Sequence, residues 1–174
     1  MSFLCYNLWV MTIIKDILGV EHNINCIACS IQDGQITLPV ERISETNYFV
    51  AEQDLEYPIE GFVILVSKRH IKSILEFTTE EEKDFSSFLI NCRKAMKEKL
   101  GIENVTIIQE EPTSSSHFHV WLFPWHSWMS NYKKKINNIM EIMDLAKKEH
   151  SNEAELSKIK ESSKKLKEYF NSYI

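Results

Sequence analysis

Residues 114–124 read Ser-Ser-Ser-His-Phe-His-Val-Trp-Leu-Phe-Pro, and this stretch decides the fold. Read with a period of two, it sends His117, His119 and Trp121 to one face and apolar residues to the other. A half-buried β-strand has this pattern, and Pro124 ends it because proline has no N–H to donate. Histidines on the polar face of a strand are often plain surface residues, so the alternation alone predicts a strand and not a site.

The residues before this strand favour a site. The segment 112–116 reads Pro-Thr-Ser-Ser-Ser, a short loop rich in hydroxyl groups. Hydroxyls and backbone N–H groups beside imidazoles suit an anionic oxygen.

The stretch His-Phe-His-Val-Trp-Leu at 117–122 resembles the signature of the histidine triad superfamily, in which three histidines alternate with apolar residues. The resemblance extends roughly from Cys26 to Pro124. It implies a nucleotide hydrolase or nucleotidyl transferase. Trp121 departs from the pattern because it occupies the place of the third histidine, where the transferase branch carries glutamine.

Length and composition indicate one globular domain with a substantial core. The chain has 174 residues and a formal net charge of −5, which argues against a broad nucleic-acid surface but leaves room for a small phosphorylated ligand. Four cysteines do not make a disulfide framework, so we expect a reducing, cytoplasmic compartment. The apolar start, Met1–Val10, has no basic n-region and is too short to span a membrane. Met11 is an alternative first residue.

We expect three segments. Residues 1–25 form an N-terminal extension, with an amphipathic helix over Met1–Gly19 that places Ile13, Ile14, Ile17 and Leu18 on one side. Residues 26–128 form a domain like that of histidine triad proteins. Residues 129–174 form a C-terminal helical hairpin packed on the same domain, with helices over Tyr132–Lys148 and Glu153–Tyr173 whose charged faces are solvated.

The central segment predicts an α+β fold. Five strands are expected, and the helix between the third and fourth begins at a capping signal, Thr78 with carboxylates at 80–82, and ends at Gly101. No alternating strand–helix units occur, so we expect an antiparallel five-stranded sheet with this helix laid across it. The expected strands are Pro39–Ile43, Tyr48–Glu52, Gly61–Ser67, Val105–Gln109 and His117–Phe123.

Cys26 and Cys29 form a Cys-x-x-Cys pair, which can bind zinc, act as a redox pair or simply be buried. Zinc-containing relatives within the superfamily carry two cysteines and two histidines in the same order. The resemblance implies a structural Zn²⁺ held by Cys26, Cys29, His70 and His117, a closed site with no open position for water. His22 is a less favoured substitute.

If His117 binds zinc, the resemblance makes His119 the nucleophile that attacks the α-phosphate of a nucleotide and forms a nucleotidyl-histidine. A neutral imidazole with its other nitrogen hydrogen-bonded is suited to that role. The resemblance places Ser114 and Gln109 at the phosphate and Asp54 at the ribose hydroxyls. An exposed loop aspartate is the alternative for Asp54.

Four aromatic residues and one histidine complete the expected site. Trp121 and Phe62 stand where the family has polar residues, so we expect a less polar pocket that binds nucleotide and hydrolyses it less efficiently. His126 can supply a proton to the leaving group or have no role. Trp125 and Trp128 can line the leaving-group side by stacking or seat the C-terminal helices, and we favour the second role.

The first interpretation is therefore an enzyme of the histidine triad type acting on a nucleotide or dinucleotide. The alternatives are a nucleotide-binding module of low activity and a zinc-stabilised interaction protein. We expect a homodimer through the helix at 79–100 and the strand Val105–Gln109, unless the C-terminal hairpin covers that surface.

Overall fold

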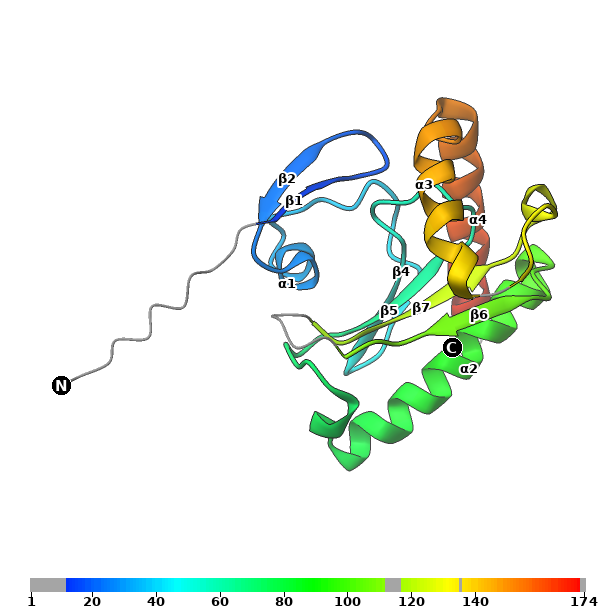
Figure 1. Ribbon diagram of the computed structural model, residues 1–174. Helices are drawn as coiled ribbons and strands as arrows, with labels where there is room; N and C mark the ends of the chain where they lie inside the picture. Colours follow the sequence, from blue (N-terminus) through cyan, green and yellow to red (C-terminus); the bar gives the residue numbers. More distant parts are fainter. Residues whose placement is uncertain (1–11, 112–116, 135, 173–174) are drawn as a thin grey trace.

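The computed structural model describes residues 12–111, 117–134 and 136–172 (Figure 1). It begins with a β-hairpin of β1 (Thr12–Lys15) and β2 (Glu21–Ile24), so the expected helix is wrong for residues 12–19. Ile13 is exposed and Ile14 is buried, which is the alternation of a strand. The Asp16 carboxylate accepts the N–H groups of Leu18 and Val20 and so stabilises the connecting turn. Residues 1–11 lie outside the described part.

The centre of the fold is a five-stranded antiparallel sheet with the strand order β3-β4-β5-β7-β6. The histidine-containing strand β7 lies inside the sheet, paired with β5 and β6. The first strand pairs with β4 only at Ser44 and Glu45, so it is shorter and begins later than the expected strand Pro39–Ile43. Pro39 has no N–H to donate to a neighbouring strand. The strands are β3 (Ser44–Glu45), β4 (Phe49–Gln53), β5 (Val63–Ser67), β6 (Val105–Ile108) and β7 (His119–Pro124).

Helix α2 (Thr79–Leu100) lies across one face of this sheet and confirms the expected bounds. Thr78 and Glu81 form the capping box at its start. Gly101 ends it with φ = 65°, the left-handed conformation that glycine adopts without steric cost. Its buried side chains Phe88, Cys92 and Met96 pack in one core with the inward residues of β4, β5 and β7.

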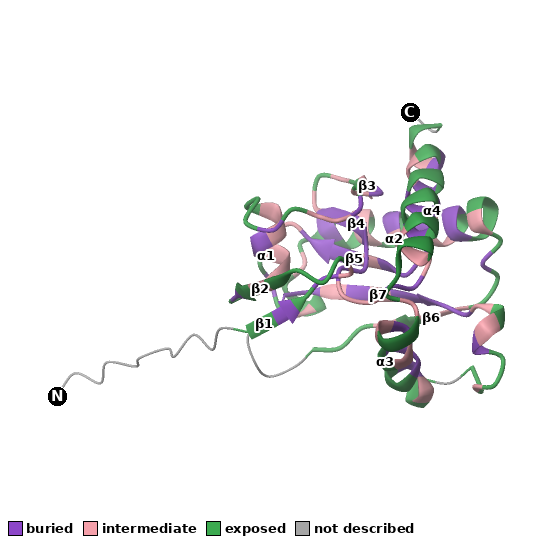
Figure 2. Ribbon diagram, turned by 90° about the horizontal axis from the view of Figure 1, so that it is seen from above, coloured by how far each residue is buried: buried purple, intermediate pink, exposed green. Residues whose placement is uncertain are grey.

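The two C-terminal helices, α3 (Ile139–Glu149) and α4 (Glu153–Asn171), follow each other closely but pack in different cores. Helix α4 packs against α2, where Leu166 and Tyr169 join the main core. Helix α3 packs with Phe123 and Trp125 in a second core, on the opposite sheet face. Figure 2 shows the separation, with α4 near α2 and α3 near β6. The prediction that the tryptophans seat these helices is confirmed for Trp125.

Short elements complete the structure. Helix α1 (Ile27–Gln32) follows the hairpin, and 3₁₀ turns occupy Ile74–Glu76, Ser127–Met129 and Ile136–Asn138. None of the helices within the described ranges combines the length and apolar character that crossing a membrane requires.

Candidate functional site

Cys26, Cys29, His70 and His117 come together in space, as expected. Cys26 precedes α1, Cys29 lies within it, His70 follows β5 and His117 precedes β7. One donor atom from each residue lies within 4.8 Å of all the others. The distances from the two sulfurs to the Nδ1 atoms are 3.7 and 3.2 Å for His70 and 3.5 Å each for His117. Standard Zn–S and Zn–N bonds at tetrahedral angles separate sulfur and nitrogen by about 3.6 Å.

The protonation of His117 also suits a metal. Its Nε2–H donates to the Ser67 carbonyl over 2.7 Å, so the lone pair is on Nδ1, the atom that faces the sulfurs. Four protein ligands leave no open position, so the cluster fits a structural Zn²⁺. His22 is not in this cluster, because its Nε2 lies 2.9 Å from the Asp16 carboxylate.

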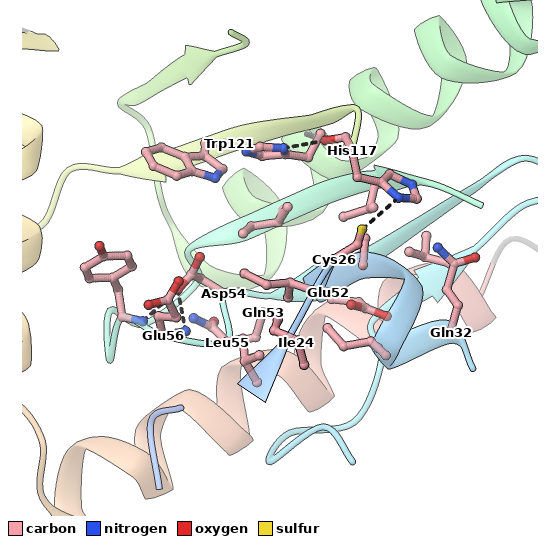
Figure 3. A pocket seen from close by; sticks show the side chains of 18 of the residues that line it. Ile24, Cys26, Gln32, Glu52, Gln53, Asp54, Leu55, Glu56, His117 and Trp121 are labelled. Atoms are coloured by element: carbon pink, nitrogen blue, oxygen red, sulfur yellow. Dashed lines mark hydrogen bonds between the residues drawn. The ribbon is translucent and has the colours of Figure 1, made fainter. Parts of the chain in front are cut away.

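A cavity of about 340 Å³ lies beside this cluster. Strands β4, β5 and β7 form one wall, while α1 and the β1–β2 hairpin form the other (Figure 3). Three of the predicted site residues, His119, Trp121 and Asp54, line the cavity, and so does the zinc-cluster residue His117. Asp54 lies more than sixty positions before the other three residues in the chain, and the sheet brings all four to one pocket.

His119 has a defined tautomer. Its Nδ1 lies 2.9 Å from the backbone carbonyl of His117, and since a carbonyl only accepts, Nδ1 carries the proton. The lone pair is therefore on Nε2. The ring is partly buried and lines the cavity, so it offers a neutral nucleophilic nitrogen there.

Trp121 lines the cavity at the place of the third histidine, and Phe62 contacts it from the second core without lining the cavity. Phe62 is fully buried, and its ring meets the Trp121 indole edge-on at a centroid distance of 5.8 Å. The two departures from the family pattern are thus in direct contact. Trp121 therefore places an apolar ring on this part of the cavity lining.

Asp54 follows β4 and is 5% exposed, so it is not the exposed loop residue of the alternative interpretation. Its Oδ1 accepts the N–H groups of Glu56 and Tyr57 over 2.8 and 2.6 Å. Burial raises the pKa of Asp54 to about 7. The two N–H groups and the Lys147 ammonium act against this shift, and the Glu56 carboxylate adds to it.

Other predicted residues are not brought to the cavity. Gln109 is exposed and its amide donates to Glu111 over 3.4 Å. Ile108 pairs with Trp121, so the next residue along β6 points to the other side of the sheet. His126 donates through Nε2 to the Glu60 carbonyl and lines a separate hollow beside Trp128. Ser114 lies outside the described residues.

Glu52 was not predicted as a site residue. Glu52, on β4, is 5% exposed and lines the cavity. The signal was available, because Glu52 lies within a strand of otherwise apolar character and shares a strand face with Val50. The β1–β2 hairpin was missed as well, since residues 12–19 were assigned to a helix.

Comparisons with known proteins agree with this geometry. No protein-family model matches the sequence. The protein hit of Bacillus subtilis is 27% identical over 104 residues, which cover 58% of this chain and 70% of that protein. A Zn-bound histidine triad family protein from Mycobacterium smegmatis superposes with a TM-score of 0.59 at 15% identity, covering 85% of this chain and 94% of the other. A histidine triad nucleotide-binding protein from Sulfolobus tokodaii gives 0.56 at 18% identity, covering 85% and 98%.

The chain is therefore an α+β protein with a Cys₂His₂ cluster that fits zinc. Its fold is that of the histidine triad superfamily.

The first prediction concerns zinc. We expect one Zn²⁺ per chain, and Cys29→Ser should lose the metal and melt at a lower temperature, because a ligand is lost from a site that joins three parts of the chain. Metal analysis and thermal melts measure both effects. Cys92→Ser is the matched control, since Cys92 is buried in the main core and should lower stability while keeping zinc. A Cys29→Ser protein with full zinc content and an unchanged melt would contradict the assignment.

The second prediction concerns Asp54. Its folded pKa of about 7 is above the ordinary value of 3.8, so the folded state binds the extra proton and loses stability as the pH rises from 4 to 7. Asp54→Asn keeps the Oδ1 acceptor and stays neutral. Its gain in unfolding free energy should grow over that range and level off above pH 7, at no more than about 4 kcal/mol.

Urea denaturation at pH 5, 6, 7 and 8 measures this gain. Asp144→Asn, on the exposed side of α3, is the control. Parallel stability curves for wild type and Asp54→Asn would show that Asp54 titrates as an exposed carboxyl.

Proposed function

We propose that the protein binds nucleoside phosphate derivatives and breaks the bond between the α-phosphate and its leaving group through a nucleotidyl-histidine on His119. The observation that carries the proposal is the His119 tautomer: Nδ1–H donates to the His117 carbonyl over 2.9 Å and the Nε2 lone pair is left for attack. The position of the ring in a cavity of about 340 Å³, within the size range of small-molecule sites, supports it.

The proposed reaction proceeds in two displacement steps. The Nε2 lone pair forms a bond to the α-phosphorus, and the bond to the leaving group breaks, with its electron pair going to the leaving oxygen or nitrogen. Water or a second nucleophile then attacks the phosphorus, the P–N bond returns its electrons to Nε2, and the attacking group loses its proton. Zinc takes no part in either step and holds His117, whose carbonyl orients the His119 ring.

Binding would use residues of β7 and the residue after β4, which line the same cavity. We assign Asp54 to the ribose hydroxyls, because it lies at the end of β4 with Oδ1 already held by two N–H groups and Oδ2 without a hydrogen bond from the described residues. Trp121 would lie against the nucleotide as an apolar wall. Ser114, three residues before His117, keeps its predicted place at the phosphate.

One observation favours a second candidate, a nucleotide-binding module with slow chemistry. The indole of Trp121 contacts Phe62 and has no acid–base group for the leaving atom. Incubation with nucleoside 5′-phosphoramidates and dinucleoside polyphosphates, followed by intact-mass measurement, separates the two. An adduct or a released monophosphate supports the enzyme, and saturable binding without either supports the module.

The third prediction is that His119→Ala abolishes turnover, because no other described histidine has a free nitrogen in the cavity without belonging to the zinc cluster. Zinc content and the melting temperature should stay close to wild type. His126→Ala is the control, since His126 lies in the separate hollow, and its turnover should be unchanged. Equal turnover in wild type and His119→Ala would remove His119 as the nucleophile.

We also propose a homodimer, now through β6 alone. Helix α4 covers the core-facing part of α2, with Phe170 packed on Phe88 at 5.8 Å, so the helix surface that suggested a dimer is partly filled within one chain. Strand β6 remains at the edge of the sheet, and its Ile107 is 50% exposed. Pairing of two such edges would remove an exposed ladder.

The fourth prediction follows from that edge. Light scattering at micromolar concentration should give twice the 20.5 kDa mass of the chain. Ile107→Lys should give monomers, because a charge on an edge strand opposes pairing. Ile90→Lys, an equally exposed site on α2, is the control and should leave the dimer intact. A wild-type mass near one chain would rule out the dimer.

A further inference from the structure

Strand β4 carries a second carboxylate, Glu52, into the cavity. Glu52 lines the cavity two residues before Asp54 on the same strand face, and it is 5% exposed (Figure 3). In the sheet register it stands opposite Ile64, which in turn stands opposite Trp121. The neighbouring row holds Val50, Val66 and His119, so Glu52 lies one row along the sheet from His119.

Glu52 forms an ion pair with Arg42, which does not line the cavity. Its Oε1 accepts from Nε and Nη2 of Arg42 over 2.8 and 2.7 Å, and Arg42 reaches Glu45 with Nη1. Oε2 accepts no hydrogen bond from the described residues. Burial raises the pKa of Glu52, Arg42 lowers it, and an N–H from a ligand would lower it further. The arrangement keeps an acceptor oxygen available beside the cavity.

The cavity wall that faces Glu52 is apolar, which suits the faces of a flat ring. Apolar side chains of the hairpin, α1 and the loop after β4 face the sheet across the cavity, namely Ile24, Ile27, Ile31 and Leu55. Residues two apart on a strand are separated by about 7 Å. If Asp54 binds the ribose, as in the function proposed above, the base of the same nucleotide reaches Glu52.

We propose that Glu52 is the residue that selects the base and that the base is guanine. A carboxylate is acceptor-only, so it favours the base edge with the most N–H donors and rejects edges that carry carbonyl oxygens. Guanine presents two adjacent donors, N1–H and the 2-amino group. Adenine offers a single amino group, hypoxanthine lacks the 2-amino group, and in uracil the N3–H lies between two carbonyls. Arg42 offsets the cost of burying the Glu52 charge, and Oε2 remains available as the acceptor for the base.

The test titrates GMP, IMP, AMP and UMP into the zinc-loaded protein by calorimetry. Wild type should bind GMP about 10- to 100-fold more tightly than IMP, the range for one hydrogen bond to a charged group. This comparison needs no variant. Glu52→Gln keeps the size of the side chain but turns N–H donors toward the base donors, so it should reduce the preference for GMP over IMP by about the same factor.

Glu45→Gln is the matched control, because it removes the other carboxylate partner of Arg42 and is exposed. It should keep the wild-type order of affinities. Equal affinities for the four nucleotides, or a GMP preference that survives Glu52→Gln, would overturn the role of Glu52 while nucleotide binding stands. No saturable binding of any of them would overturn the proposed function and the base selection together.

Discussion

The hydrogen bond from His117 Nε2 to the Ser67 carbonyl is the contact on which the site depends. It fixes the proton on one side of the ring and leaves Nδ1 facing the two cysteines. The backbone carbonyl of the same residue accepts the Nδ1–H of His119. His117 therefore connects the Cys₂His₂ cluster, the last residue of β5 and the His119 ring that lines the cavity. A change in the orientation of His117 would alter all three.

Residues with strong local signals could be predicted from the sequence. The capping box and Gly101 defined α2, and alternation in residues 117–124 defined β7 and its cavity-facing side chains. The zinc cluster was predicted because its four residues follow the order found in related proteins, and the sheet brings them within 4.8 Å. These features depend on neighbouring residues or on a motif with an unusual composition.

The wrong predictions concern contacts between distant parts of the chain, which a local sequence pattern does not specify. Ile13 and Ile14 fit one side of a helix equally well, and only the pairing of β1 with β2 separates them. Gln109 was placed by counting from the end of a strand, where a shift of one residue moves the side chain to the opposite face. The partition of α3 and α4 between two cores could not be read from their apolar spacing, since both show the same helical period.

The ligands of the metal cluster are far apart in the chain, and Cys26 and His117 are separated by 91 positions. The cysteine pair and α1 are made early during synthesis, whereas His117 arrives only after α2 and β6 have been completed. Closing so long a loop costs entropy before any ligand is gained. Full tetrahedral binding must therefore follow formation of the sheet, so the metal locks a domain that has already folded and does not nucleate it. A nascent chain that has not yet reached His117 offers at most the two sulfurs and His70, so the closed four-ligand site is completed only once β7 begins.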